Sequence, residues 1–117
     1  MHFKWLERHV RHFQEALRGL ERGDGYWTCY NAYISVRALL MGVLGFDPYK
    51  DVTTVATLTA LVKKALPNAP GDVIDCAKCL EKRLSEPLGD RCVKCADKIV
   101  EYIKTLPLSP ATKIADL

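Results

Sequence analysis

The sequence predicts an all-α protein: an up-and-down four-helix bundle with one additional short helix. Apolar residues recur every three or four positions through most of the chain, which is the period of one helix face. No stretch alternates apolar and polar residues as a half-buried strand does, and there is no internal repeat. Pro and Gly residues divide the chain into segments of helical length. Its 117 residues are enough for one domain with its own core.

Composition indicates a globular protein without a strong charge. The hydrophobic fraction is 49% and the charged fraction 26%, and the net charge of +3 permits an acidic partner or nucleic acid without requiring one. The longest apolar stretch, residues 38–46, is too short to cross a bilayer, and the first residues contain no apolar core of the kind found in signal peptides. We therefore expect a cytoplasmic protein.

The first two helices are expected on either side of Gly23. Gly23 suits the position after a helix end, and Asp24 suits the cap of the next helix. The first helix carries a seam of apolar residues at alternating spacings of three and four: Phe3, Leu6, Val10, Phe13, Leu17 and Leu20. The second helix, residues 25–44, is apolar on nearly all sides, which predicts a central helix that also forms a homodimer interface. Arg37 lies inside this apolar run and needs a partner.

Three further helices follow. Asp51 or Thr53 is the expected cap of the third helix, and Asp72 is the expected cap of the fourth. The fifth helix is expected from about residue 90 to residue 106. The expected core positions of these last two helices are Val73, Ala77, Leu80 and Leu84, then Cys92, Ala96, Ile99 and Ile103. A loose tail, residues 107–117, is expected after a bundle formed by residues 1–106.

Four of the five cysteines form two CxxC motifs whose neighbours place both on helices. A Pro-Leu-Gly-Asp turn between the motifs folds the helices back on each other, which pairs Cys76 with Cys95. The same register pairs Cys79 with Cys92. Three interpretations stay open: two disulfides with these pairings, one zinc ion held by all four thiolates, or four buried free thiols. Cys29 has no evident partner and is expected in the core. Disulfides in a cytoplasmic protein would suggest a hyperthermophilic archaeon.

Two histidines on the first helix are the other metal candidates. His9 and His12 share one face at a spacing able to hold a metal, but a third ligand is not evident. We therefore expect a solvated basic face with Arg8 and Arg11. The chain contains neither a phosphate-binding glycine loop nor a serine-nucleophile motif.

Several segments together form the pattern of a known family. They are the sequence Arg-Gly-Asp-Gly-Tyr at 22–26, Ala-Leu-Leu-Met-Gly-Val-Leu-Gly at 38–45, Leu58 and Leu61 in the third helix, and Ala96, Ile99 and Ile103 in the last. Over about residues 3–106 the chain resembles the HEPN domain (higher eukaryotes and prokaryotes nucleotide-binding), particularly its small stand-alone archaeal members. The resemblance implies an up-and-down helical bundle that commonly dimerises. It also implies a role beside a minimal nucleotidyltransferase, in toxin–antitoxin or defence systems, or as a metal-independent RNase.

The ribonuclease members of that family carry an Arg followed a few residues later by a His, near the start of the last helix. Arg91 matches the Arg, but no His follows it, and Asp97 lies near the expected position. General acid–base work on an RNA 2′-hydroxyl would lack its usual imidazole. We therefore predict a non-catalytic HEPN-like module without a cofactor. It partners a nucleotidyltransferase subunit or binds a nucleotide or RNA, with Arg37 and Arg91 as binding residues. A weak, toxin-like RNase using Arg91 and Asp97 stays an alternative, as does a small structural protein with a four-cysteine zinc site.

Overall fold

The computed structural model describes residues 1–50 and 56–107, which form five α-helices and no strand. In chain order the helices are α1 (Phe3–Glu21), α2 (Gly25–Val43), α3 (Leu58–Ala65), α4 (Gly71–Glu81) and α5 (Gly89–Thr105). The predicted all-α class is therefore confirmed. The expected caps Asp51 and Thr53, and all of the predicted tail except Pro107, lie outside the described residues.

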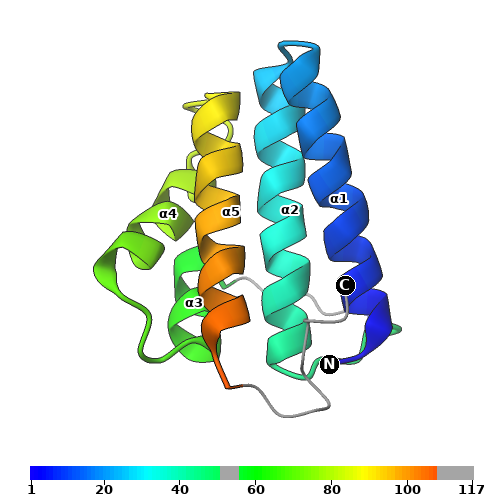
Figure 1. Cartoon of the computed structure of the whole chain (residues 1–117), viewed down its shortest axis with the longest axis vertical. Coiled ribbons are helices and arrows are strands. Elements are labelled where there is room, and N and C mark those ends of the chain that lie inside the picture. The colour runs from blue at the N-terminus through cyan, green and yellow to red at the C-terminus, as the bar shows by residue number, and fades with distance from the viewer. Residues whose placement is uncertain (51–55, 108–117) are drawn as a thin grey trace.

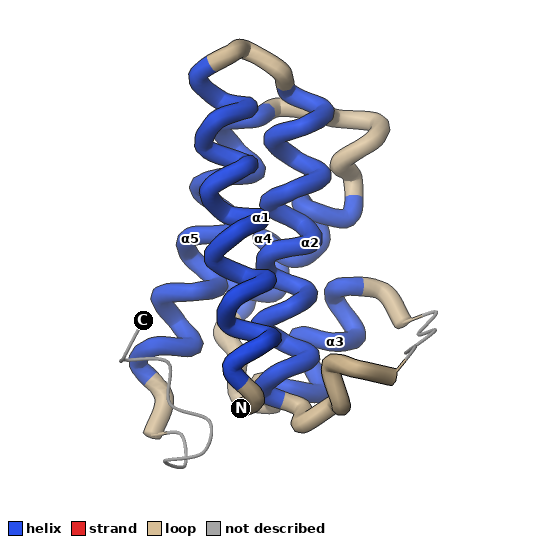
Figure 2. The backbone as a smooth tube through the Cα atoms, turned by 90° about the vertical axis from the view of Figure 1, so that its right-hand side faces the viewer, coloured by secondary structure: helices blue, strands red, loops and turns tan. Residues whose placement is uncertain are grey.

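The helices gather around α2. α1 and α2 form an antiparallel hairpin, and α5 lies beside α2 (Figure 1). α4 packs against α5, and the short α3 contacts both α4 and α2. Viewed from the side, α3 lies near the end of the molecule that holds the N-terminus (Figure 2). The radius of gyration is 13.3 Å, so the described elements form one helical bundle.

α2 has the central position that its apolar sequence predicts. It contacts each of the other four described helices. Most of its residues from Thr28 to Gly42 are buried, although Tyr26, Trp27 and Tyr30 near its start are exposed. None of the described helices combines the length and the apolar character that a membrane span needs. Its contacts with four helices account for the apolar character of α2.

α1 buries a different face from the predicted one. Phe3, Leu17 and Leu20 of the predicted seam are 60%, 42% and 36% exposed, and the rest of the seam is half-buried. The buried positions are Trp5, His9, Ala16 and Gly19. A methyl group added at Gly19 would lie 2.6 Å from Oγ1 of Thr28, so the small residues of α1 let the two helices approach closely. The polar atoms of the buried rings find partners, which removes the cost of burying them.

The helix ends follow the sequence signals in part. Gly23 has a positive φ of 71° and Asp24 caps α2 with its side chain, both as predicted. Thr57 caps α3. α4 begins after Pro70, so the predicted cap Asp72 is wrong, and this residue lies in the first turn instead. A carboxylate there still interacts favourably with the positive end of the helix dipole.

α4 and α5 form the predicted hairpin, and the chain reverses direction between them (Figure 1). The four predicted core positions of α5 are buried: Cys92, Ala96, Ile99 and Ile103. On α4, Val73, Ala77 and Leu80 are buried as predicted, but Leu84 is 69% exposed. The helix ends at Glu81, so Leu84 does not continue its core stripe.

Candidate functional site

A small pocket lies between α1, α2 and the loop that follows α2. Its volume is about 280 Å³. It is lined by Trp5, Arg8, His12, Ile34, Arg37, Ala38, Met41, Pro48 and Lys50. These residues include three full positive charges and no carboxylate. Their charge makes the pocket a candidate site for an anion.

Arg37 enters this pocket from the C-terminal half of α2. It is half-buried, and no hydrogen bond or ion pair joins it to another described residue. Ile34, Ala38 and Met41 line the same pocket, so the guanidinium is partly removed from water, and no described carboxylate lies against it. The partner that Arg37 is expected to have is not found among residues 1–50 or 56–107. An anion from outside the chain would supply it.

Arg8 and the loop after α2 form another part of the pocket wall. The Nη2 of Arg8 donates to the carbonyl oxygen of Pro48 (2.8 Å), and its guanidinium lies 4.9 Å from the centre of the Trp5 ring. The Nε1 of Trp5 donates to the carbonyl oxygen of Phe46 (2.7 Å). These contacts fix the loop to α1, and the loop brings Lys50 to the pocket. The wall is therefore formed before a ligand arrives, which lowers the entropy cost of binding.

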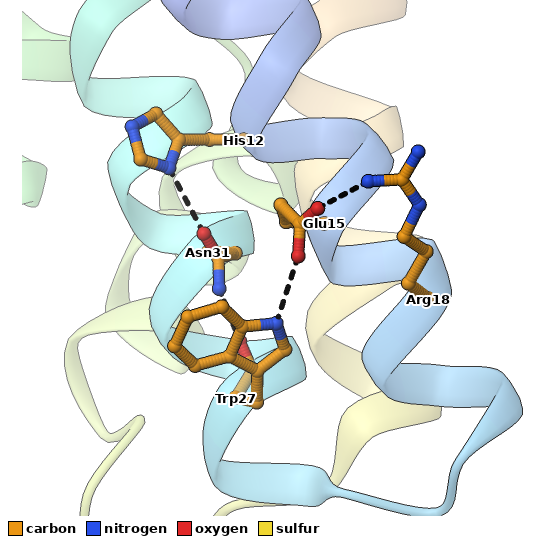
Figure 3. A network of polar contacts seen from close by, with 5 residues as sticks. All are labelled: His12, Glu15, Arg18, Trp27 and Asn31. Carbon is orange, nitrogen blue, oxygen red and sulfur yellow. Dashed lines mark hydrogen bonds and ion pairs between the residues drawn. The ribbon is translucent and has the colours of Figure 1, made fainter.

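His12 belongs to a polar network that spans α1 and α2 (Figure 3). Its Nδ1 lies 2.9 Å from Oδ1 of Asn31, and Nδ2 of Asn31 donates to the carbonyl oxygen of Trp27 (2.9 Å). Because Oδ1 of Asn31 only accepts, Nδ1 of His12 carries the hydrogen. The other ring nitrogen of His12 points away from Asn31 (Figure 3), and His12 lines the pocket. Trp27 also donates to Glu15 (3.3 Å), whose pKa is lowered mainly by its hydrogen bond from Arg18.

The chemistry of the pocket suits phosphate. An Arg guanidinium donates two parallel hydrogen bonds to phosphate oxygens, and a Lys ammonium adds a point charge. At about 280 Å³ the cavity lies near the lower end of the range for ligand sites, which is roughly 300–1,000 Å³. It has room for a phosphate group with part of the attached sugar, and a nucleobase would remain outside.

The sequence predicts Arg37 as a binding residue, places Arg8 and His12 on a basic face of the first helix, and gives no signal for Lys50. Arg8 and His12 are one helical turn apart, so the sequence does contain the signal that they share a side of α1. The same spacing also fits a solvated basic face, which is what the sequence predicts there. Lys50 follows α2 in the chain, and its position depends on the path of the loop.

His9 is buried, so the predicted solvated face is wrong at this position. Its Nδ1 donates to the carbonyl oxygen (3.1 Å) and the hydroxyl oxygen (2.7 Å) of Ser35, and that hydroxyl donates to the carbonyl oxygen of His9 (2.9 Å). Burial lowers the pKa of His9; the bond to Ser35 opposes this, and the charge of Lys104 lowers the pKa further. His9 and His12 therefore each bond to α2, and His9 has a structural role.

Cys29 and Cys92 form a disulfide that joins α2 to α5, with a Cα–Cα distance of 5.2 Å. The predicted Cys79–Cys92 pairing is therefore wrong, and so is the expectation that Cys29 has no partner. Cys92 lies in the middle of the buried stripe of α5, which packs against the central helix α2. This position was visible in the helix period, because a residue in the middle of a core stripe faces the centre of the bundle.

The other three cysteines are free thiols: Cys76, Cys79 and Cys95. The predicted Cys76–Cys95 disulfide is thus absent. Burial raises the pKa of Cys95, and the nearby thiols of Cys76 and Cys79 raise it further. With Cys92 in a disulfide, a four-thiolate zinc site lacks one of its ligands. Among the residues that the structure describes, no group of three or more His, Cys, Asp or Glu is arranged to hold a metal ion.

Arg91 lies apart from the Arg37 pocket. It lines two cavities beside the free thiols, of about 510 and 460 Å³. Its guanidinium is 4.0 Å from the carboxylate of Glu86, in an exposed ion pair that contributes little to stability. Asp97 is exposed and lines neither cavity. The structure therefore brings Arg91 together neither with Arg37 nor with Asp97.

Comparison with known proteins adds no family to these observations: no family model, curated protein or solved structure matches the chain.

Proposed function

We propose that this protein is a non-catalytic, HEPN-like binding module that holds the phosphate of a nucleotide in the pocket around Arg37. The observation that carries the proposal is an arginine that has no partner among residues 1–50 and 56–107. It is half-buried beside Arg8 and Lys50, and the described lining of its pocket contains no carboxylate. A bound phosphate would accept hydrogen bonds from the guanidinium and neutralise its charge.

The rest of the nucleotide would lie outside the pocket, near exposed aromatic groups. Tyr49 is exposed and follows Pro48, which lines the pocket. Tyr30 is exposed one helical turn before Ile34, another residue of the lining. Either ring offers a nucleobase a surface on which to stack. A mononucleotide is therefore a better match to this surface than free phosphate.

The architecture supports the HEPN part of the proposal without testing it. Two long helices, a short one and a second hairpin follow each other in the order expected for an up-and-down four-helix bundle with an additional short helix. We accordingly propose residues 1–106 as the HEPN-like unit, residues 107–117 as a tail, and a cytoplasmic location.

A homodimer is part of the same proposal, and its support now comes from α1 as well as α2. The predicted seam of α1 leaves Phe3, Leu17 and Leu20 exposed, and α2 exposes Tyr26. Large apolar side chains spaced in heptad fashion along an exposed helix are typical of a helix–helix interface. A minimal nucleotidyltransferase subunit stays the proposed second partner, by the family resemblance alone.

Isothermal titration with ATP, adenosine and tripolyphosphate tests the nucleotide proposal. ATP is expected to bind, tripolyphosphate to bind more weakly, and adenosine not to bind measurably. Arg37→Ala is expected to weaken ATP binding by about tenfold or more, because a hydrogen bond to a charged group is worth roughly 1.5–3 kcal/mol. Arg91→Ala is the matched control and is expected to leave ATP binding unchanged. Equal losses in both variants, or no ATP binding to the wild-type protein, would remove the proposal.

No specific contact favours the two alternatives. Arg91 and Asp97 share no cavity, and Cys92 is in a disulfide. The RNase hypothesis keeps a simple test, which is RNA cleavage in the presence of a chelator. Cleavage that is lost in Arg91→Ala would replace the non-catalytic proposal.

A further inference from the structure

Three thiols between α4 and α5 have no part in the proposed nucleotide site. Cys95 of α5 interacts with the thiols of both Cys76 and Cys79, which are one helical turn apart on α4. Cys76 is buried, whereas Cys79 and Cys95 are partly exposed. The cluster therefore contains two thiols that a reagent can reach and a third below the surface.

The surroundings of these thiols are basic. The cavity of about 510 Å³ is lined by Cys76 and Cys95, by Arg91, Lys94 and Lys98, and by a single carboxylate, that of Asp90. The ammonium of Lys98 forms an ion pair with Asp72 (2.9 Å) and also interacts electrostatically with Cys76 and Cys95. The neighbouring cavity of about 460 Å³ adds Cys79 together with Lys78 and Lys82, against the carboxylates of Asp75 and Glu86. The positive side chains around these cavities attract anionic reagents.

We propose that Cys79 and Cys95 are a redox-active thiol pair that reacts with anionic small-molecule disulfides, of which oxidised glutathione is the example used here. Both thiols are partly exposed, and Cys79 reacts first because burial and the two neighbouring thiols raise the pKa of Cys95. The product is a new disulfide between α4 and α5. This modification site is independent of the proposed nucleotide binding.

The chemistry is a pair of thiol–disulfide exchanges. The thiolate of Cys79 attacks one sulfur of oxidised glutathione, which forms a mixed disulfide and releases one glutathione thiolate. Cys95 then gives up its proton and attacks the Cys79 sulfur, which forms the Cys79–Cys95 bond and releases the second glutathione. Two protein thiols are oxidised, and one small-molecule disulfide is reduced to two thiols.

The chain would then hold two disulfides with different roles. Cys29 and Cys92 are both buried, so their bond is shielded from exchange. The new bond would form one turn further along α5, at a surface that solvent reaches. It would connect α4 covalently to α5, which the first bond already connects to α2.

Thiol counting by intact mass tests the order of events. The folded protein is treated with oxidised glutathione, denatured in maleimide and weighed. The wild-type protein is expected to take up three maleimides before treatment and one afterwards, without retained glutathione. Cys95→Ser is expected to stop at the mixed disulfide and keep one glutathione on Cys79. Cys76→Ala is the matched control and is expected to close the new bond at the wild-type rate.

Two results of this experiment would overturn the proposal. One is a wild-type protein that keeps all three thiols. The other is a Cys95→Ser variant that closes a second disulfide as fast as the wild-type protein, since Cys95 would then take no part. The disulfide between Cys29 and Cys92 is an internal check, because it should persist in every sample.

A comparison of reagents tests the contribution of the basic cavities. Oxidised glutathione is anionic, hydroxyethyl disulfide is neutral, and cystamine is cationic. Each rate is divided by the rate of the same reagent with a free small-molecule thiol. The normalised rates are expected to fall severalfold in that order. Arg91→Gln is expected to reduce the ratio between the normalised rates of oxidised glutathione and cystamine. Equal normalised rates would show that charge does not select the reagent, and would overturn that part of the proposal.

Discussion

Reduction of the Cys29–Cys92 disulfide is expected to destabilise the protein strongly. The two cysteines are 63 residues apart in the sequence, and the bond restrains the unfolded chain by closing that loop. In the chain-entropy model, loops of 15 and 100 residues correspond to about 3 and 4.7 kcal/mol. A loop of this size therefore corresponds to about 4 kcal/mol. Reduction leaves both sulfur atoms in place, so no cavity adds to this cost.

The same loss can be expressed as a melting temperature. Unfolding entropy is about 2.1 cal/mol/K per residue, which gives roughly 0.25 kcal/mol/K for a chain of this length. A loss of about 4 kcal/mol then lowers Tm by about 15 °C. This is a large fraction of the total stability of a small domain, which is about 5–15 kcal/mol.

Urea unfolding followed by circular dichroism, with and without a phosphine reductant, measures the effect. The free energy of unfolding is expected to fall by about 4 kcal/mol on reduction. The control is Cys95→Ser, which keeps the bond between Cys29 and Cys92 and should respond to the reductant as the wild-type protein does. A loss below about 1 kcal/mol would refute the reasoning, because the bond would then not restrain the unfolded chain.

Three further outcomes are expected. Gly25→Ala should lower the free energy of unfolding, measured in urea, by roughly 1–3 kcal/mol, because the added methyl group meets the backbone carbonyl of Pro87. Gly71→Ala is the control and should leave that free energy unchanged, because the space beside Gly71 is open. Wild-type stability should be complete above the ordinary His9 pKa of 6.5 and should decrease as pH falls below it, because the unfolded chain then binds the proton more readily; a His9→Gln variant with the same slope of Tm against pH would contradict this. Leu17→Glu should convert the proposed dimer to a monomer of about 13 kDa in light scattering, and a wild-type protein that is already monomeric at micromolar concentration would count against the dimer.

The sequence predicts α5 better than α1, and the reason is physical. On α5, the residues at 92, 96, 99 and 103 form one apolar stripe opposite a charged face, so only one side can be buried. α1 has two sides that could be buried. The apolar seam is the side that the period predicts, but Ala16 and Gly19 allow a closer approach to α2. On the buried side His9 bonds to Ser35 of α2, and Trp5 bonds to Phe46 in the loop after α2. Such an approach depends on the partner helix and not on the apolar period of α1.

The residues of the candidate site are also predictable from the sequence only in part. Arg37 is conspicuous in the sequence because a charge inside an apolar helix needs a partner. Arg8 and Lys50 become part of the same pocket only through the packing of α1 and the path of the loop. The Cys29–Cys92 disulfide also depends on packing. The spacing of the two CxxC motifs relates only α4 to α5, and it gives no information about Cys29, which lies 63 residues before Cys92 in the sequence.

The central claim is that phosphate binds beside Arg37, and the two tryptophan indoles provide the most direct test. Trp5 lines the pocket, and its Nε1 donates to the carbonyl oxygen of Phe46. Trp27 lies outside the lining, and its Nε1 donates to Glu15. In a ¹⁵N-labelled sample titrated with ATP, the indole resonance of Trp5 is expected to shift in a saturable way, and the resonance of Trp27 is expected to move much less. A Trp5 resonance that does not move, while ATP shifts amide resonances around Arg91, would contradict the claim.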